Sequence, residues 1–518
     1  MRTRNYFLIL WLISGHCLVS TAAESAHSPT AVARFIDQQM AAMWRSQELV
    51  PSEVCADHEY LRRVCLDVAG VIPTEHAVTQ FLQDRADDKR VTAVETLLKT
   101  QTYARYSAAT WANLWIGRGK DADALIHARF REWLFLQIRA NKPFDHIVTE
   151  ILTATGTPVE TPAVAWTLHH AAKPENLAAN SARLFLGRQM QCAQCHDHPF
   201  EPITQEDFYH FAAFFARTKV QPFLISKRVS ETSSGEMHLG GVPTGQVIAP
   251  RFMDGTTPSA AGTRRQQLAA WITHPNHRNF SRAITNRVWA RLFGRGLVDP
   301  VDDLNPRQTP DFPKVLDRLA DEFIYSGYDL QYLIRTITRT RVYQLSSQPS
   351  RNNRGDERFF SKARLRRLNP EQLVGSVVMS TGLASSEQAW QNPIFRLLLQ
   401  VVVQDFTFVF GNMDETTEVS EFRGTIAQAL MMMNSKHMTN ATRFHLLSPL
   451  TQKLQRCRSV NEKIELLFRT TLSRRPTTAE LRTFGSYFRA APQTSRQLEV
   501  CEDLYWALLN CNEFHFNY

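Results

Sequence analysis

The sequence predicts a mainly α protein made of two helical domains, which are joined by a short Gly/Pro-rich segment with some β structure. Apolar residues recur at spacings of three and four over most of the chain, as in Leu319, Phe323, Leu330 and Leu333. This spacing is the period of an amphipathic helix. We therefore expect helices to form most of the structure.

The exception to this period is the stretch from residue 218 to residue 262. Glycines and prolines there separate short β-prone stretches at residues 223–225 and 246–248, a pattern typical of strands and turns. We expect this segment to link a helical domain at 24–217 to a second helical domain at 263–518.

Helix starts in both predicted domains carry capping residues. Thr204 and Thr477 each stand three residues before an acidic residue, Asp207 and Glu480, and Asn369 precedes a proline; these are N-terminal capping patterns. The first of them predicts a helix at 205–216 that places Phe208, Phe211 and Phe215 on one face, a stripe more typical of a core than of a cofactor wall.

A second break is predicted near residues 346–362, in a polar run that is also rich in arginine. Such a basic run forms either a solvated surface or an anion-binding patch.

The N-terminus predicts a secretory signal peptide at residues 1–23. Arg2 and Arg4 precede an apolar run, and Thr21-Ala22-Ala23 places small residues at a cleavage site. The run is shorter than the 18 or more residues that a membrane span needs, and no later stretch is long and apolar enough. We expect an exported protein of the periplasm or cell surface, with no transmembrane anchor after signal cleavage.

The charge and cysteine content exclude few functions. The net charge of +9 is spread over 518 residues, so we expect no nucleic-acid partner. Seven of the eight cysteines follow the predicted cleavage site, and a chain of this size needs no disulfide framework. The sequence leaves open the pairing of Cys55, Cys65, Cys457, Cys501 and Cys511.

One segment, residues 192–200, carries a specific chemical pattern. Cys192, Cys195 and His196 form C-x-x-C-H, the spacing of c-type haem attachment. Two thiols three residues apart can each bond to a haem vinyl group, and the adjacent imidazole can bind the iron. The sequence therefore predicts haem c at Cys192 and Cys195, with His196 as the iron ligand.

Other interpretations of this segment stay open. Cys192, Cys195 and His198, together with His196, are residue types that bind zinc, and Cys192 and Cys195 could instead form a disulfide or a redox-active pair. A haem iron could also remain five-coordinate or take a sixth ligand. The candidates for that ligand are Met190, His169, His170, His210 and His238.

Patterns of other catalytic classes are missing from the sequence, which contains no G-x-S-x-G, H-E-x-x-H, phosphate-binding or dinucleotide-binding motif. Asp299, Asp302 and Asp303 gather near prolines and could supply acid–base or Ca²⁺ chemistry, although acids in such a loop are more often turn formers and helix caps. A hydrolase that uses Asp302 and Asp303 is therefore a third interpretation.

Several motifs together resemble a known family. Residues 61–74, 192–200 and 204–215 resemble the planctomycete cytochrome-related domain of unknown function. The second half resembles the planctomycete-specific C-terminal domain that usually follows it, through residues 249–255, 286–289, 293–298, 507–510 and 513–514. The resemblance implies an exported protein without a settled activity. Many relatives carry a further c-type cytochrome domain, whereas this chain has a single C-x-x-C-H, so only Cys192, Cys195 and His196 are carried over as haem-site residues.

Two functions are therefore expected from the sequence. The first is an exported redox or electron-transfer component that holds one haem c and acts with a partner protein or assembly. The alternative is a non-redox periplasmic or surface protein with a structural zinc site or disulfide at the motif, for which an association with carbohydrate is one option.

Overall fold

The computed structural model describes most of the chain from residue 25 to residue 518, and the predicted signal peptide at 1–23 lies outside the described residues. The gaps are residues 119–123, 224–225, 243, 260, 308, 384–389, 391, 411–425, 445–447 and 492–493. Within the described residues the protein is mainly helical, and its strands form small two-stranded sheets. The predicted fold class is therefore confirmed.

The N-terminal half is a layered array of helices up to residue 212. Several of these helices begin at a hydroxyl side chain that accepts a bond from the backbone of the first turn, as Ser28, Thr74 and Thr100 do. The elements are α1 (Pro29–Ser46), α2 (Asp57–Val64), the π-helical segment η1 (Cys65–Ala69), α3 (Glu75–Gln83), α4 (Lys89–Leu98), α5 (Gln101–Ile116), α6 (Ala124–Arg139), α7 (Phe144–Thr153), η3 (Pro162–Val164), α8 (Ala165–His169), α9 (Pro174–Leu186), η4 (Gln191–Gln194) and α10 (Gln205–Ala212).

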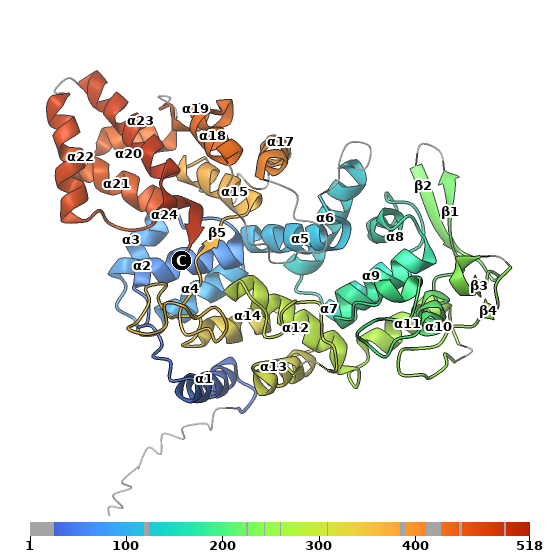
Figure 1. Ribbon diagram of the computed structural model, residues 1–518. Coiled ribbons are helices and arrows are strands. Elements are labelled where there is room, and N and C mark those ends of the chain that lie inside the picture. The colour runs from blue at the N-terminus through green and yellow to red at the C-terminus, as the bar shows by residue number, and fades with distance from the viewer. Residues whose placement is uncertain are drawn as a thin grey trace, which may run out of the picture.

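The Gly/Pro-rich segment forms two small antiparallel sheets. β1 (Thr218–Phe223) pairs with β2 (Ser226–Glu231), and β3 (Met237–His238) pairs with β4 (Val247–Ile248), with the short turn η5 (Leu239–Gly241) between them. The predicted β structure at 246–248 is confirmed by β4; of the stretch 223–225, Phe223 ends β1 and residues 224–225 lie outside the described residues. The hairpin lies near α10, at the end of the molecule opposite α20–α23 (Figure 1).

The C-terminal half returns to helices, which again begin at capping residues. Asn369 and Thr477 form the predicted caps here, as Thr204 does for α10 in the first half, and each of the three belongs to a complete capping box. The elements are α11 (Arg264–Thr273), α12 (Arg278–Phe293), α13 (Pro313–Tyr325), α14 (Leu330–Arg339), β5 (Arg366–Arg367), α15 (Pro370–Ser380), α17 (Pro393–Phe410), α18 (Ile426–Asn434), α19 (Lys436–Thr442), α20 (Pro449–Arg456), α21 (Val460–Leu472), α22 (Thr478–Ala490), α23 (Thr494–Asn510), α24 (Asn512–His515) and β6 (Phe516–Asn517). Among the described helices, we find none whose length and apolar character together would let it cross a membrane.

The helix predicted at 205–216 is shorter than expected, because α10 ends at Ala212. The next residues form tight turns, in which the N–H groups of Phe214 and Phe215 bond to the carbonyls of Phe211 and Ala212. Such bonds between residues three apart commonly close a helix end. Phe208, Phe211 and Phe215 are nevertheless all fully buried, as a core stripe requires.

The buried apolar residues form two clusters, and the chain changes from one to the other near residue 360. The first cluster runs from Val32 to Phe360 and so takes residues from both sides of the Gly/Pro-rich segment. The second joins Leu66, Ala69, Val71 and Ile72 to residues between Leu368 and Phe514. The helices on either side of residues 218–262 therefore share a core, and the segment α2–η1 contributes to both clusters.

The predicted break at 346–362 lies at this change of cluster, and several of its basic side chains are engaged within the protein. Lys362 Nζ donates to three backbone carbonyls of its own loop. Arg358 pairs with Asp311, and just after the loop Arg366 pairs with the buried Asp67. These basic residues therefore serve to close the loop and to attach it to the helices.

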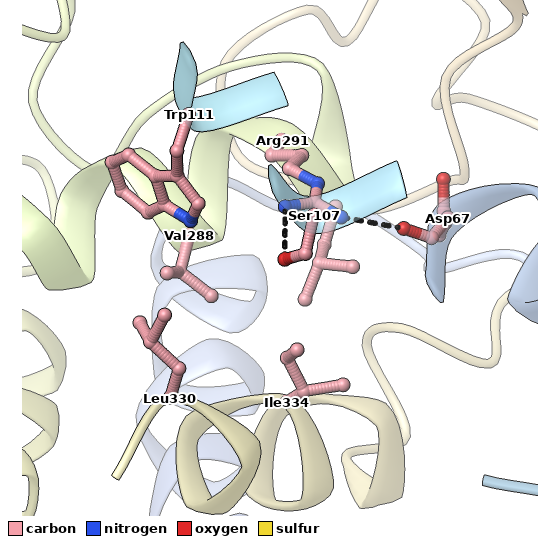
Figure 2. A pocket seen from close by; sticks show the side chains of 8 residues that line it. Asp67, Ser107, Trp111, Val288, Arg291, Leu330 and Ile334 are labelled. Atoms are coloured by element: carbon pink, nitrogen blue, oxygen red, sulfur yellow. Dashed lines mark hydrogen bonds between the residues drawn. The ribbon is translucent and has the colours of Figure 1, made fainter. Parts of the chain in front are cut away.

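A cavity of about 10 Å³ lies where α5, α12, α14 and η1 meet. Arg291 Nη1 lies 3.4 Å from Ser107 Oγ, and Arg291 Nη2 donates to the Asp67 backbone carbonyl at 3.3 Å (Figure 2). Because a cavity of this size holds at most about one water molecule, we regard it as a packing feature and not as a ligand site.

We predict that His515 makes the protein less stable in acid. His515 is buried, its Nε2 donates to the Leu509 carbonyl at 3.1 Å, and burial lowers the pKa of the imidazole to about 4 from the ordinary 6.5. The stability that the neutral ring contributes is fully present above pH 6.5 and is lost progressively as the pH falls from 6.5 to about 4, a total loss of roughly 3 kcal/mol. Urea unfolding at pH 7 and pH 4.5 measures it. The His515→Gln variant should lose less stability than the wild type between these pH values; an equal loss would contradict the prediction.

Candidate functional site

The C-x-x-C-H motif lies in the loop that joins α9 to α10. α9 ends at Leu186 and is capped by Gly187, which adopts a left-handed conformation with φ 62°, a backbone geometry that glycine accepts without strain. The motif residues then form the short 3₁₀ turn η4, and α10 begins at the Thr204 cap. Two helix ends therefore fix where the motif begins and where the next helix starts.

Both thiols of the motif are free and exposed to solvent. The side chains between and before them, Ala193 and Met190, are buried at 0% and 1% exposure. The Ala193 N–H bonds to the Met190 carbonyl, and the Cys195 N–H bonds to the Cys192 carbonyl. Because the apolar residues anchor the turn on its inner side, Cys192 and Cys195 face outward.

The two histidines of the motif have opposite hydrogen-bonding patterns. His196 Nδ1 lies 2.7 Å from the Asp197 carbonyl and therefore donates to it. In the neutral ring this leaves Nε2 without a proton and with a free lone pair. His198 Nδ1 accepts from the N–H groups of Phe200 and Glu201 at 3.2 and 2.9 Å, which leaves the proton on Nε2. His196 is thus oriented to bind a metal through Nε2, whereas His198 could do so only if its proton moved to Nδ1, which would break the two backbone bonds that Nδ1 accepts.

This difference bears on the zinc interpretation, in which Cys192, Cys195 and His198 are ligands. Within the described part of the chain, no group of three His, Cys, Asp or Glu side chains is placed to hold a metal ion. Of the two histidines, His196 is the one whose Nε2 carries the lone pair. The geometry of the loop therefore favours His196 over His198 as a ligand.

The first turns of α10 hold the backbone of the motif. Gln205 Nε2 donates to the carbonyls of Gln194 and Cys195, each at 3.1 Å, and the Gln205 N–H bonds to Asp197 Oδ1 at 2.8 Å. The Tyr209 hydroxyl donates to the Gln194 carbonyl at 3.3 Å. Burial, with the nearby Glu175 and Cys195, raises the pKa of Tyr209.

A loop from the second half of the chain, residues 298–307, clasps the motif loop. Asp302 accepts from Gln189 Nε2 at 2.7 Å and pairs with Arg183 at 3.4 Å. The Leu304 N–H bonds to the Gly187 carbonyl at 2.7 Å, and Arg307 donates to the Phe200 carbonyl at 2.9 Å. We call residues 298–307 the clasp loop.

The clasp loop is itself held by α12. Asn286, buried within that helix, donates to the carbonyls of Val298 and Val301 and accepts from the Val298 N–H. On the motif side, Arg188 forms a buried ion pair with Glu201. Burial, together with the carboxylates of Glu201 and Asp302, raises the pKa of Asp303.

These contacts give Asp302 a structural role that the sequence interpretation as a hydrolase residue did not include. The Asp302 side chain is 6% exposed and is bonded to both Arg183 and Gln189. Sequence reasoning also missed Arg188, Gln189 and Arg307, because no local motif marks their partners.

The candidate sixth ligands lie in different places. His169 packs against both His170 and His127. His169 and His170 precede the N-terminal end of α9, whereas the motif follows its C-terminal end. Because α9 has 13 residues, its two ends are about 20 Å apart. Met190 is buried. His210 and His238 each donate through Nδ1 to a backbone carbonyl, that of Ala249 and that of Gly245.

A larger cleft of about 480 Å³ lies in the Gly/Pro-rich segment. Arg217, Glu231, Arg264 and Gln267 contribute to its lining, and none of the lining residues belongs to the motif. The two arginines both pair with Glu236, so the charge of this cleft is largely balanced.

Comparison with known protein families identifies two regions of the chain. Residues 35–220 match the family PSCyt2, described as a protein of unknown function (DUF1549). Residues 264–488 match the family PSD1, also described as a protein of unknown function (DUF1553). No curated protein and no solved structure matches the chain. The motif loop lies in the first region, and the clasp loop lies in the second.

We predict that Asp302→Asn weakens the joint between the two regions. The substitution removes a buried charge that pairs with Arg183, so the free energy of unfolding should fall by about 2 kcal/mol. The matched control is Asp317→Asn, which removes an exposed pair with Arg282 and should cost less than about 1 kcal/mol. Urea unfolding measures the free energy of unfolding of both variants. Equal losses would contradict a stabilising contact between the clasp loop and the motif loop.

Proposed function

Because the chain belongs to the proteins that combine a PSCyt2 domain with a PSD1 domain, we propose that it is an exported protein that holds one covalent haem c at the motif. Its role in this proposal is that of a redox or electron-transfer component, which acts with a partner protein or within a larger assembly. The name PSCyt2 agrees with a relation to cytochromes. The observation that carries the proposal is the geometry of Cys192, Cys195 and His196.

The two thiols suit covalent attachment because they are free, exposed and three residues apart. In a thioether, the sulfur bonds to one vinyl carbon and the thiol hydrogen goes to the other, so no oxidant or reductant is consumed. The buried anchors Met190 and Ala193 hold the turn, while both cysteines remain exposed.

His196 suits the role of iron ligand through the bond that its other nitrogen makes. A ligating histidine usually donates its second N–H to a carbonyl or carboxylate, which fixes the ring and increases its basicity. The Asp197 carbonyl, 2.7 Å from His196 Nδ1, is such an acceptor. A haem bound here would supply the one-electron chemistry of its iron.

We predict one covalent haem per chain after expression, with the signal peptide, in a host that matures c-type cytochromes. A pyridine haemochrome spectrum of the denatured protein, with metal analysis, measures it. Cys192→Ala and Cys195→Ala should each reduce the retained haem severalfold, and the double variant should retain none. Cys457→Ala is the matched control, because it removes a half-buried thiol outside the motif.

Two outcomes would reject this proposal. The first is wild-type protein without covalent haem; stoichiometric zinc in such protein, or a Cys192–Cys195 disulfide, would favour the non-redox alternative. The second is full haem retention by the double variant.

Export has its own test. The predicted cleavage after Ala23 gives a mature chain that begins at Glu24, which the intact mass of the periplasmic protein measures. A purified chain that begins at Met1 would contradict export through this signal.

A further inference from the structure

Phe200, four residues after His196, is the feature of the motif loop that the proposed chemistry leaves unexplained. Its side chain is 73% exposed. A single exposed apolar residue is ordinary on a protein surface, so exposure alone indicates no function.

What distinguishes Phe200 is that its backbone is fixed on both sides. Its N–H bonds to His198 Nδ1 at 3.2 Å, and its carbonyl accepts from Arg307 of the clasp loop at 2.9 Å. The next residue, Glu201, bonds to the same His198 nitrogen and pairs with Arg188. The loop thus presents an aromatic ring to solvent from a held backbone, and a ligand would meet it at a small cost in conformational entropy.

A second exposed apolar side chain lies on another segment that adjoins the motif. Val242 is 52% exposed and directly follows η5. A Cβ atom on Gly241 would lie 3.6 Å from the Tyr209 hydroxyl, and that hydroxyl donates to the Gln194 carbonyl within the motif. Exposed apolar groups therefore occur on the motif loop itself and on the segment beside Tyr209, a residue of α10 that bonds to the motif.

We propose that Phe200, with Val242, forms an apolar seat for the tetrapyrrole ring of a porphyrin bound at the motif. This inference rests on the proposed function. A porphyrin is flat and apolar over most of its surface, and aromatic side chains pack well against such rings. The seat explains why the loop that carries two free thiols also fixes the backbone of an exposed phenylalanine.

The test removes covalent attachment and iron ligation from the measurement. The full-length chain carrying Cys192→Ala and Cys195→Ala is titrated with metal-free protoporphyrin IX, and the dissociation constant is read from porphyrin fluorescence. Adding Phe200→Ala should weaken binding about tenfold, and adding Val242→Ala should weaken it less. Tyr487→Ala is the matched control, because Tyr487 is an exposed aromatic residue on α22 at 60% exposure and should leave binding unchanged.

Three results would overturn the inference. These are no porphyrin binding by the cysteine-free chain, equal effects of Phe200→Ala and Tyr487→Ala, and a change of oligomeric state on Phe200→Ala in the absence of porphyrin. The last result, read by analytical ultracentrifugation, would assign the residue to a contact between copies of the chain.

The same measurements separate this inference from the proposed function. If the wild type acquires covalent haem but Phe200→Ala does not change the dissociation constant for porphyrin, only the seat is rejected. Porphyrin binding that depends on Phe200, in a protein that never acquires covalent haem, rejects the proposed attachment and retains the seat as a non-covalent site.

Discussion

The buried carboxylate of Asp67 connects segments from the whole length of the chain. It accepts two bonds from Arg366 at 2.8 and 2.9 Å, one from the Tyr343 hydroxyl at 2.8 Å and one from Asn517 at 2.7 Å. A charge in the interior is tolerated only when hydrogen bonds satisfy it, and removing one partner leaves the other uncompensated. Because η1 also contributes to both apolar clusters, the relative placement of the two cores depends on this carboxylate.

The helix α12 connects this centre to the candidate site. Near its C-terminal end, Arg291 donates to the Asp67 backbone carbonyl. Earlier in the helix, Arg287 donates to the carbonyls of Arg183 and Leu184 in α9, and Asn286 holds the clasp loop. One helix of the PSD1 region thus fixes the end of α9, from which the motif loop begins. The second region therefore contributes to the shape of a site whose cysteines and histidines all lie in the first.

The sequence predicts those features that depend on neighbouring residues. The caps at Thr204, Asn369 and Thr477 are confirmed because a capping box is complete within four residues. The bonds from Gln189 to Asp302 and from Arg307 to Phe200 join residues 113 and 107 positions apart, and no local pattern marks such partners. The difference between His196 and His198 also needed coordinates, because it depends on which backbone groups face each ring nitrogen.

Asp197 shows how the motif and the next helix are coupled. Its backbone carbonyl accepts from His196 Nδ1 at 2.7 Å, and its carboxylate accepts from the N–H of Gln205, the first residue of α10, at 2.8 Å. The orientation of the His196 ring is therefore tied to the first turn of α10. The buried aromatic residues Phe208 and Phe211 hold that helix in the first core. A ring that is exposed to solvent thus takes its direction from the interior, while the thiols beside it remain free to react.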